Sequence, residues 1–73
     1  MATRVKADVA GTVWKITARA GAVVAADEEI MILESMKMEI PVAAPAAGRI
    51  ARFLVAEGET IAEGQDLAEI DAT

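Results

Sequence analysis

The sequence predicts an all-β domain in which two similar sheets pack as a flattened barrel or sandwich. Three observations support this fold class. Five glycines and two prolines divide the 73-residue chain into short segments. The segments between them have the length of strands and are rich in valine, isoleucine and threonine. The two halves of the chain also resemble each other, which indicates an internal repeat.

Four runs are the clearest predicted strands: 12–18 (TVWKITA), 29–33 (EIMIL), 38–42 (MEIPV) and 49–55 (RIARFLV). The first and last begin directly after a glycine, and the third contains a proline. The alanine-rich stretch at 43–47 would favour a helix, but Pro45 and Gly48 interrupt it. We therefore expect short strands throughout the chain.

A shift of 37 residues aligns residues 4–36 with residues 41–73 without a gap. The matched pairs include Gly11 with Gly48, Gly21 with Gly58, Val13 with Ile50, Ile16 with Phe53, and Leu33 with Ile70. Each copy is too small to bury its own apolar face. The two copies are therefore predicted to pack together with near two-fold symmetry, as one domain over residues 1–73.

The apolar pattern slips by one residue at the same place in each copy. Val13 and Ile16 cannot both face inward on an ideal strand, because an odd spacing puts side chains on opposite faces. The same conflict recurs at Ile50 and Phe53. A β-bulge or a strong twist near residues 14–15 and 51–52 would resolve it. Trp14 would then lie at or near the surface, although a core position for this residue fits the sequence equally well.

Composition narrows the possible functions. The chain has no cysteine and no histidine, which excludes thiolate chemistry and removes the commonest metal ligand. A net charge of −5, with one Trp and one Phe, argues against nucleic acid and anionic membranes as partners. No apolar run approaches the roughly 20 residues of a membrane span. No signal peptide is visible, so we expect a cytoplasmic module. The acidic residues are interpreted as solvated, and no metal site is expected.

A β-hairpin with its turn at Met36 and Lys37 is predicted at the junction of the two copies, within ESMKMEI (residues 34–40). Antiparallel pairing then sets Ser35 opposite Met38. Two-residue hairpin turns normally use Asn, Gly or Asp, because these residues adopt positive φ readily, and this turn has none of them. A type I turn would tolerate Met and Lys, but nothing structural requires them there.

The same pairing sets Glu34 opposite Glu39, which is mildly unfavourable because like charges then lie side by side. Lys37 projects from the turn at one end of the domain, and the two-fold arrangement puts both termini at the other end. Large apolar side chains at an exposed turn cost solubility unless they meet a core or a partner. Met36 is therefore interpreted as a recognition residue, and Met38 as one that also packs on the core.

The motif ESMKMEI resembles the attachment site of the biotin carboxyl carrier family, in which the lysine of a Met-Lys-Met turn is biotinylated. The similarity covers nearly the whole chain, because residues 10–21 resemble the first strand-and-turn unit of these biotinyl domains and residues 48–70 the second. It implies a barrel-sandwich hybrid of two quasi-symmetric four-stranded sheets. Some bacterial carriers insert a thumb before the second half. Equal segment lengths in the two copies predict no thumb here.

The resemblance also implies a function. In this family a biotin protein ligase joins biotin to the lysine amine through biotinyl-adenylate, which assigns covalent biotin to Lys37. The residues assigned to recognition by the ligase or by partners are Met36, Met38, Glu34, Glu39 and Ser35. The arm would take carboxylate from a biotin carboxylase to a carboxyltransferase that acts on an acyl-CoA. As a free-standing chain, the protein is expected to be a monomer that serves separate subunits and catalyses no reaction itself.

Two alternatives share the predicted fold. One is a lipoyl-type carrier, including the glycine-cleavage type, although such carriers usually have Asp-Lys-Ala at the turn. The other is an unmodified β-module that acts only in assembly. Because biotinyl, lipoyl and unmodified chains differ in mass, the intact mass of the protein from its native host distinguishes all three.

Overall fold

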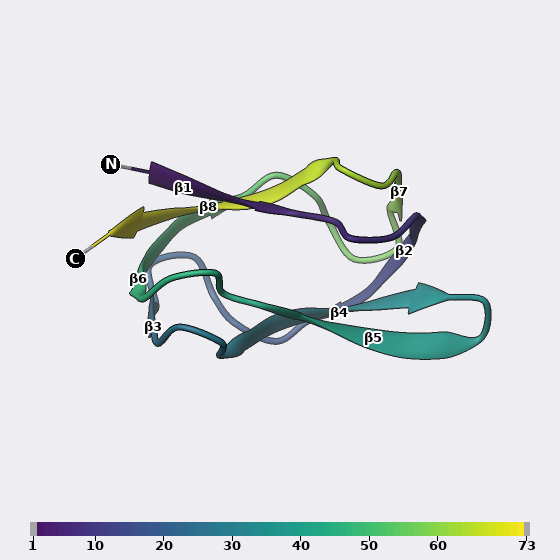
Figure 1. Cartoon of the computed structure of the whole chain (residues 1–73), viewed down its shortest axis with the longest axis horizontal. Helices are drawn as coiled ribbons and strands as arrows, with labels where there is room; N and C mark the ends of the chain where they lie inside the picture. The colour runs from purple at the N-terminus through teal and green to yellow at the C-terminus, as the bar shows by residue number, and fades with distance from the viewer. Residues whose placement is uncertain (1, 73) are drawn as a thin grey trace.

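The computed structural model describes residues 2–72, which form eight strands and no helix. The strands are β1 (Ala2–Lys6), β2 (Gly11–Ile16), β3 (Val23–Val24), β4 (Glu29–Ser35), β5 (Met38–Ala43), β6 (Gly48–Phe53), β7 (Thr60–Ile61) and β8 (Asp66–Ala72). Figure 1 shows them as two layers in an elongated molecule. The predicted all-β class with two four-stranded sheets is confirmed. Within these residues no helix is long and apolar enough to cross a membrane.

The two sheets have the same strand order, displaced by half the chain. Sheet A has the order β1-β8-β6-β3 and sheet B the order β5-β4-β2-β7, and the paired strands of each are antiparallel. A shift of 37 residues carries β1 onto β5, β2 onto β6, β3 onto β7 and β4 onto β8. It therefore converts one sheet order into the other. The fold has a near two-fold relation between its halves.

Neither half of the chain forms a sheet by itself. In each sheet the central pair of strands comes from one half, and both outer strands come from the other. The turns are bonded across in the same way. The Gly21 N–H donates to the Ile50 carbonyl, and the Gly58 N–H donates to the Val13 carbonyl, both at 2.7 Å. The halves therefore satisfy each other's backbone hydrogen bonds, which an isolated half would leave open.

The predicted bulges are confirmed in both halves. The register of β2 against β4 shifts between Val13 and Lys15, and that of β6 against β8 shifts between Ile50 and Arg52. Val13 and Ile50 are fully buried, as the bulges require. Trp14 is 48% exposed, so of its two possible positions the structure adopts the one at the surface.

The core lies between the sheets and is apolar throughout the described residues. Its largest fully buried side chains are Ile30, Met31, Leu33, Ile50, Leu67, Ile70 and Val13. Most of them form pairs related by the 37-residue shift, such as Ile30 with Leu67 and Leu33 with Ile70. The two halves thus contribute matching side chains to one core.

The β4–β5 hairpin and the chain termini lie at opposite ends of the long axis (Figure 1). This agrees with the two-fold relation predicted from the sequence. In the first half β4 ends at Ser35 and the chain turns directly into β5. In the second half the equivalent strand β8 spans Asp66–Ala72.

Two equivalent glycines are required by close backbone packing. A Cβ at Gly11 would overlap the carbonyl oxygen of Glu34, and one at Gly48 would overlap that of Asp71. These contacts bring β2 against β4, and β6 against β8. We predict that Gly48→Ala lowers the free energy of unfolding by about 1–3 kcal/mol, because the strands have to separate. Urea denaturation of the variant measures this loss.

The matched control is Ala51→Ser, which lies on the exposed face of the same strand. Its free energy of unfolding should stay within about 0.5 kcal/mol of the wild type. If Gly48→Ala is as stable as the control, the close approach of β6 and β8 is wrong.

Candidate functional site

The β4–β5 hairpin has the register predicted from the sequence. Ser35 pairs with Met38, so the turn consists of Met36 and Lys37 alone. Farther from the turn, the side chain of Leu33 in β4 is buried in the core. A slip of one residue would move this side chain to solvent, which fixes the register.

The turn itself differs from the type I turn that the sequence was expected to tolerate. Met36 has φ of 51° and Lys37 has φ of 65°, so both lie in the left-handed region of a type I′ turn. The reason is the right-handed twist of paired strands, which a type I′ turn matches and a type I turn does not. For residues other than glycine this conformation costs roughly 1–2 kcal/mol each. The buried side chains of the hairpin fix its register, and this register forces the two turn residues into the costly conformation.

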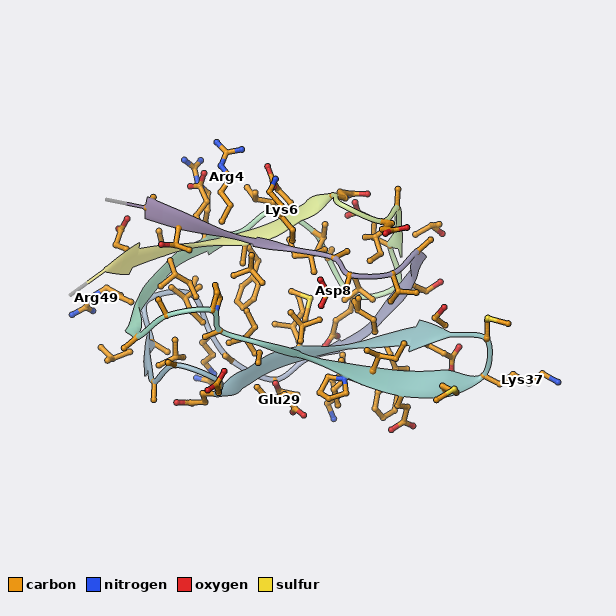
Figure 2. All side chains as sticks on the ribbon, in the orientation of Figure 1. Arg4, Lys6, Asp8, Glu29, Lys37 and Arg49 are labelled. Carbon is orange, nitrogen blue, oxygen red and sulfur yellow. The ribbon has the colours of Figure 1, made fainter. Side chains whose placement is uncertain are left out.

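Lys37 is exposed and points away from the body of the molecule along its long axis (Figure 2). Among residues 2–72 no side chain forms an ion pair or hydrogen bond with its amine. The other lysines differ in position. Lys6, in β1, forms an ion pair with Asp66 at 2.7 Å, and Lys15 lies within β2. Lys37 is thus a primary amine presented at the tip of the molecule.

The two methionines are both exposed. Met36 is 92% exposed and Met38 is 65% exposed. The expectation that Met38 also packs on the core is wrong. Its side chain is on the same strand face as Ile40, but the hairpin extends beyond the end of the core, and only Ile40 is half-buried. The tip of the hairpin therefore presents two large apolar side chains to solvent.

The remaining residues predicted for recognition fall into two groups. The Ser35 hydroxyl donates a hydrogen bond of 2.9 Å to the Ala10 carbonyl and is half-buried, so it anchors the hairpin to the segment before β2. Glu34 and Glu39 pair across the hairpin, as predicted, and both are exposed. Neither forms an ion pair within residues 2–72. Their charges are therefore free to meet a partner.

The ion pairs of the described residues lie on sheet A, away from the hairpin. Asp66 accepts hydrogen bonds from Lys6 and Arg4, which hold the pKa of this carboxyl below its ordinary value of 3.8. The hydrogen bond and charge of Asp66 in turn raise the pKa of Arg4. Figure 2 shows the Arg4 and Lys6 side chains projecting from β1, in the layer opposite to the one that contains β5. These ion pairs make the outer surface of sheet A polar and charged.

One shallow pocket of about 200 Å³ opens between the segment after β1 and strand β5. It is lined by Lys6, Asp8, Val9, Leu33, Ile40, Pro41, Val42 and Ala43. Six of its eight lining residues are apolar, and the other two are Asp8 and Lys6. In residues 2–72 no group of three or more acidic side chains lies close enough to hold a metal ion. The exposed primary amine of Lys37 lies at the hairpin tip and not in this pocket.

Comparison with known proteins identifies the family. The sequence profile described as "Biotin-requiring enzyme" matches residues 1–70. The chain belongs to this family. The chain is 39% identical to the biotin/lipoyl attachment protein of Bacillus subtilis, and the match covers 90% of each chain. It is 36% identical to the "Biotinylated protein TB7.3 homolog" of Mycobacterium leprae, covering 96% of this chain and 99% of that protein.

The fold has a close counterpart in a much larger protein. A solved structure of a single-chain, multi-domain long-chain acyl-CoA carboxylase contains a region 36% identical to this chain, with a TM-score of 0.91. The match covers 99% of this chain and 7% of that one. The chain therefore corresponds to one small domain of the carboxylase.

The turn geometry predicts how substitutions at Met36 affect stability. Met36→Asn should raise the free energy of unfolding by up to about 1 kcal/mol, because Asn adopts positive φ readily. Met36→Val should lower it by about 1 kcal/mol, because a β-branched residue is poorly accommodated there. Thermal and urea denaturation measure both changes. Met38→Val is the control, since this exposed strand position favours Val. Equal stability of the two Met36 variants would contradict the type I′ turn.

Proposed function

We propose that this chain is a cytoplasmic biotin carboxyl carrier in which Lys37 holds biotin through an amide bond. It would present the cofactor in turn to a biotin carboxylase and to the carboxyltransferase of a biotin-dependent carboxylase acting on an acyl-CoA. The observation that carries the proposal is the position of Lys37, an exposed amine at the tip of the β4–β5 hairpin with no ion pair to the described residues 2–72. The flanking methionines complete the Met-Lys-Met motif of the family.

The relatives support this proposal at two levels. The two small proteins, which match this chain over almost their full length, are named for attachment of biotin or lipoyl groups and for biotinylation. The acyl-CoA carboxylase supports the reaction and its substrate class, although this chain spans only 7% of it. Attachment of the cofactor therefore has stronger support than the choice of acyl-CoA as substrate.

The residues around Lys37 fit an attachment site. Amide formation requires the neutral Nζ atom to bond to the carboxyl carbon of biotinyl-adenylate, the bond from that carbon to the phosphate oxygen to break so that AMP leaves, and the nitrogen to lose a proton. The chain has no histidine, and no side chain within residues 2–72 hydrogen-bonds to this amine. The ligase must therefore supply the proton acceptor as well as the activated acid. This chain supplies geometry, since its turn holds the amine beyond the surface of both sheets.

The fold also suits a carrier. When bound, biotin supplies a ureido nitrogen that can accept and release a carboxylate. The two sheets give the hairpin a fixed base, because Met31 and Leu33 of β4 are buried in the core. A tether to Lys37 raises the effective concentration of the cofactor at each partner enzyme. The chain's own part is to position and deliver.

The alternatives are weaker for this turn. A lipoyl-type carrier shares the family and fold, but the Met-Lys-Met sequence favours biotin. An unmodified assembly module would leave the strained turn and the exposed methionines without a purpose. Intact mass of the protein from its host tests all three, and only a biotinyl adduct on Lys37 agrees with the proposal.

One prediction of the proposed function concerns the acceptor. Lys37→Arg should abolish biotin incorporation by a biotin protein ligase, because a guanidinium group does not form the amide. The free energy of unfolding should change by less than about 0.5 kcal/mol, as for other exposed positions. Mass spectrometry of the ligation product and urea denaturation measure the two effects. Lys6→Arg is the matched control and should be biotinylated normally. Full biotinylation of the Lys37→Arg chain would refute the assignment.

Another prediction of the proposed function concerns the methionines. Because both are exposed, Met36→Ala and Met38→Ala should each change the free energy of unfolding by less than about 1 kcal/mol, well below the 2–5 kcal/mol of a core methionine. Biotinylation rate or carboxyl transfer should fall in both. Met31→Ala, in the core, is the control that should lose the full amount. If Met36→Ala melts many degrees lower yet is biotinylated normally when folded, its role is structural instead.

A further inference from the structure

The two-fold relation allows the outer faces of the two sheets to be compared position by position. Both faces have the same strand order and the same bulge, so backbone geometry makes the same demands on each. The equivalent residues, sheet B first, are Pro41 and Arg4, Ile32 and Glu69, Trp14 and Ala51, Lys15 and Arg52, and Glu34 and Asp71. The shared backbone geometry therefore does not explain why equivalent positions have different side chains on the two faces.

The outer face of sheet A satisfies its own charges. Glu69 pairs with Arg4 on β1 and with Arg52 on β6 in the strand register. Its carboxylate lies 3.6 Å from the Arg4 guanidinium and 2.7 Å from that of Arg52. Asp66 binds Arg4 and Lys6 in addition. This face is a network of exposed ion pairs, a typical solvated surface.

The outer face of sheet B has Pro41 and Ile32 where sheet A has Arg4 and Glu69, and Trp14 where sheet A has Ala51, whereas Lys15 and Glu34 keep a charge. Ile32 pairs with Pro41 on one side and with Lys15 on the other. The bulge in β2 turns both Trp14 and Lys15 outward beside Ile32. Pro41 is exposed and Trp14 is 48% exposed. Trp14, Ile32 and Pro41 therefore form one stripe across three strands, which we name the Trp14 patch.

Protection of the sheet edge does not account for this stripe. Proline suits an edge strand such as β5, because it lacks the N–H that would template another strand. Yet β1 is the equivalent edge strand and has Arg4 at that position. The tryptophan and isoleucine lie on inner strands, where edge protection is not needed. An apolar stripe in place of an ion-pair network indicates a partner.

We propose that the Trp14 patch, together with Glu34 and Glu39, is the docking surface for biotin protein ligase. This inference rests on the proposed function of Lys37. The complementary ligase surface is an apolar recess for the indole ring with lysine or arginine beside it. The two glutamates lie on the same face, between the patch and the turn, and have no ion pair within residues 2–72. They would meet those cations.

The position of the patch favours the ligase over the later partners. Ile32 precedes Lys37 by five residues, a distance of roughly 17 Å along a strand. An interface of standard size, about 800 Å² on each partner, is roughly 30 Å across and covers both. The ligase has to bring the lysine amine itself into its active site, so its surface must meet the flank of the hairpin. The carboxylase has to reach only the end of the tethered cofactor.

The test is a surface exchange in the full chain, assayed with its biotin protein ligase, biotin and ATP. The variant Trp14→Ala, Ile32→Glu, Pro41→Arg gives the patch the residues found at the equivalent positions of sheet A. The same backbone already accommodates this set. We expect the KM for the chain to rise about tenfold or more, with kcat changed less than about twofold, because docking is lost while the turn is intact.

The matched control is Arg4→Ala with Glu69→Ala, which alters the equivalent positions on sheet A and should leave KM within about twofold of the wild type. Circular dichroism melting establishes that both proteins are folded in the assay. A second measurement does not depend on the patch variant. Trp14 is the single tryptophan, so a Lys37→Arg chain labelled with fluorotryptophan gives one fluorine NMR signal. Added ligase should shift or broaden it.

An unchanged KM for the patch variant, or a fluorine signal unmoved by saturating ligase, overturns the docking surface while biotin on Lys37 still supports the proposed function. A wild-type chain that the ligase leaves unmodified overturns both. If the patch variant is biotinylated normally but fails in carboxyl transfer, the occupant is a carboxylase enzyme. If the wild type sediments as a dimer and the variant as a monomer, the occupant is a second copy. Either result refutes the ligase assignment.

Discussion

The exchange of strands between the two halves is the constraint on which the rest of this structure depends. Each sheet takes its central pair of strands from one half and its outer strands from the other, so no half can complete its hydrogen bonds alone. The core is shared in the same way, with matching side chains such as Leu33 and Ile70. A chain of 73 residues is near the lower limit for an independent core, and this sharing lets both halves bury one apolar face.

The geometry of the functional end follows from that constraint. Because the chain passes from one half to the other between β4 and β5, it must turn there, and the termini must lie at the opposite end. The paired strands are held by the core and impose their twist on the two residues between them. Met36 and Lys37 accept positive φ as a result. The backbone position of Lys37 is therefore set by the paired strands that precede and follow the turn.

The symmetry of the fold also separates what structure requires from what function adds. Gly11 and Gly48 are equivalent because both halves need the same close approach of strands. Ile32 and Glu69 occupy equivalent positions yet have opposite chemistry, on backbones of the same geometry. Internal repeats thus provide a control within one molecule. The sheet that has Ile32 and Pro41, where the other has Glu69 and Arg4, is the one whose β4–β5 hairpin carries Lys37.

Local pattern determined much of this protein. The period of two along the strands, the repeated slip after Val13 and Ile50, and the pairing of Ser35 with Met38 were predictable, because they depend on which residues are apolar and in what order. The motif also assigns the acceptor to Lys37, which stays a prediction. Only the tertiary structure decided the type I′ turn, since the twist of the assembled sheet overrides the preference of Met36. It also decided that Met38 is exposed and that Trp14 lies on the outer face. Exposure depends on where the opposite sheet ends and which strands lie alongside, and the sequence pattern of a single strand contains neither.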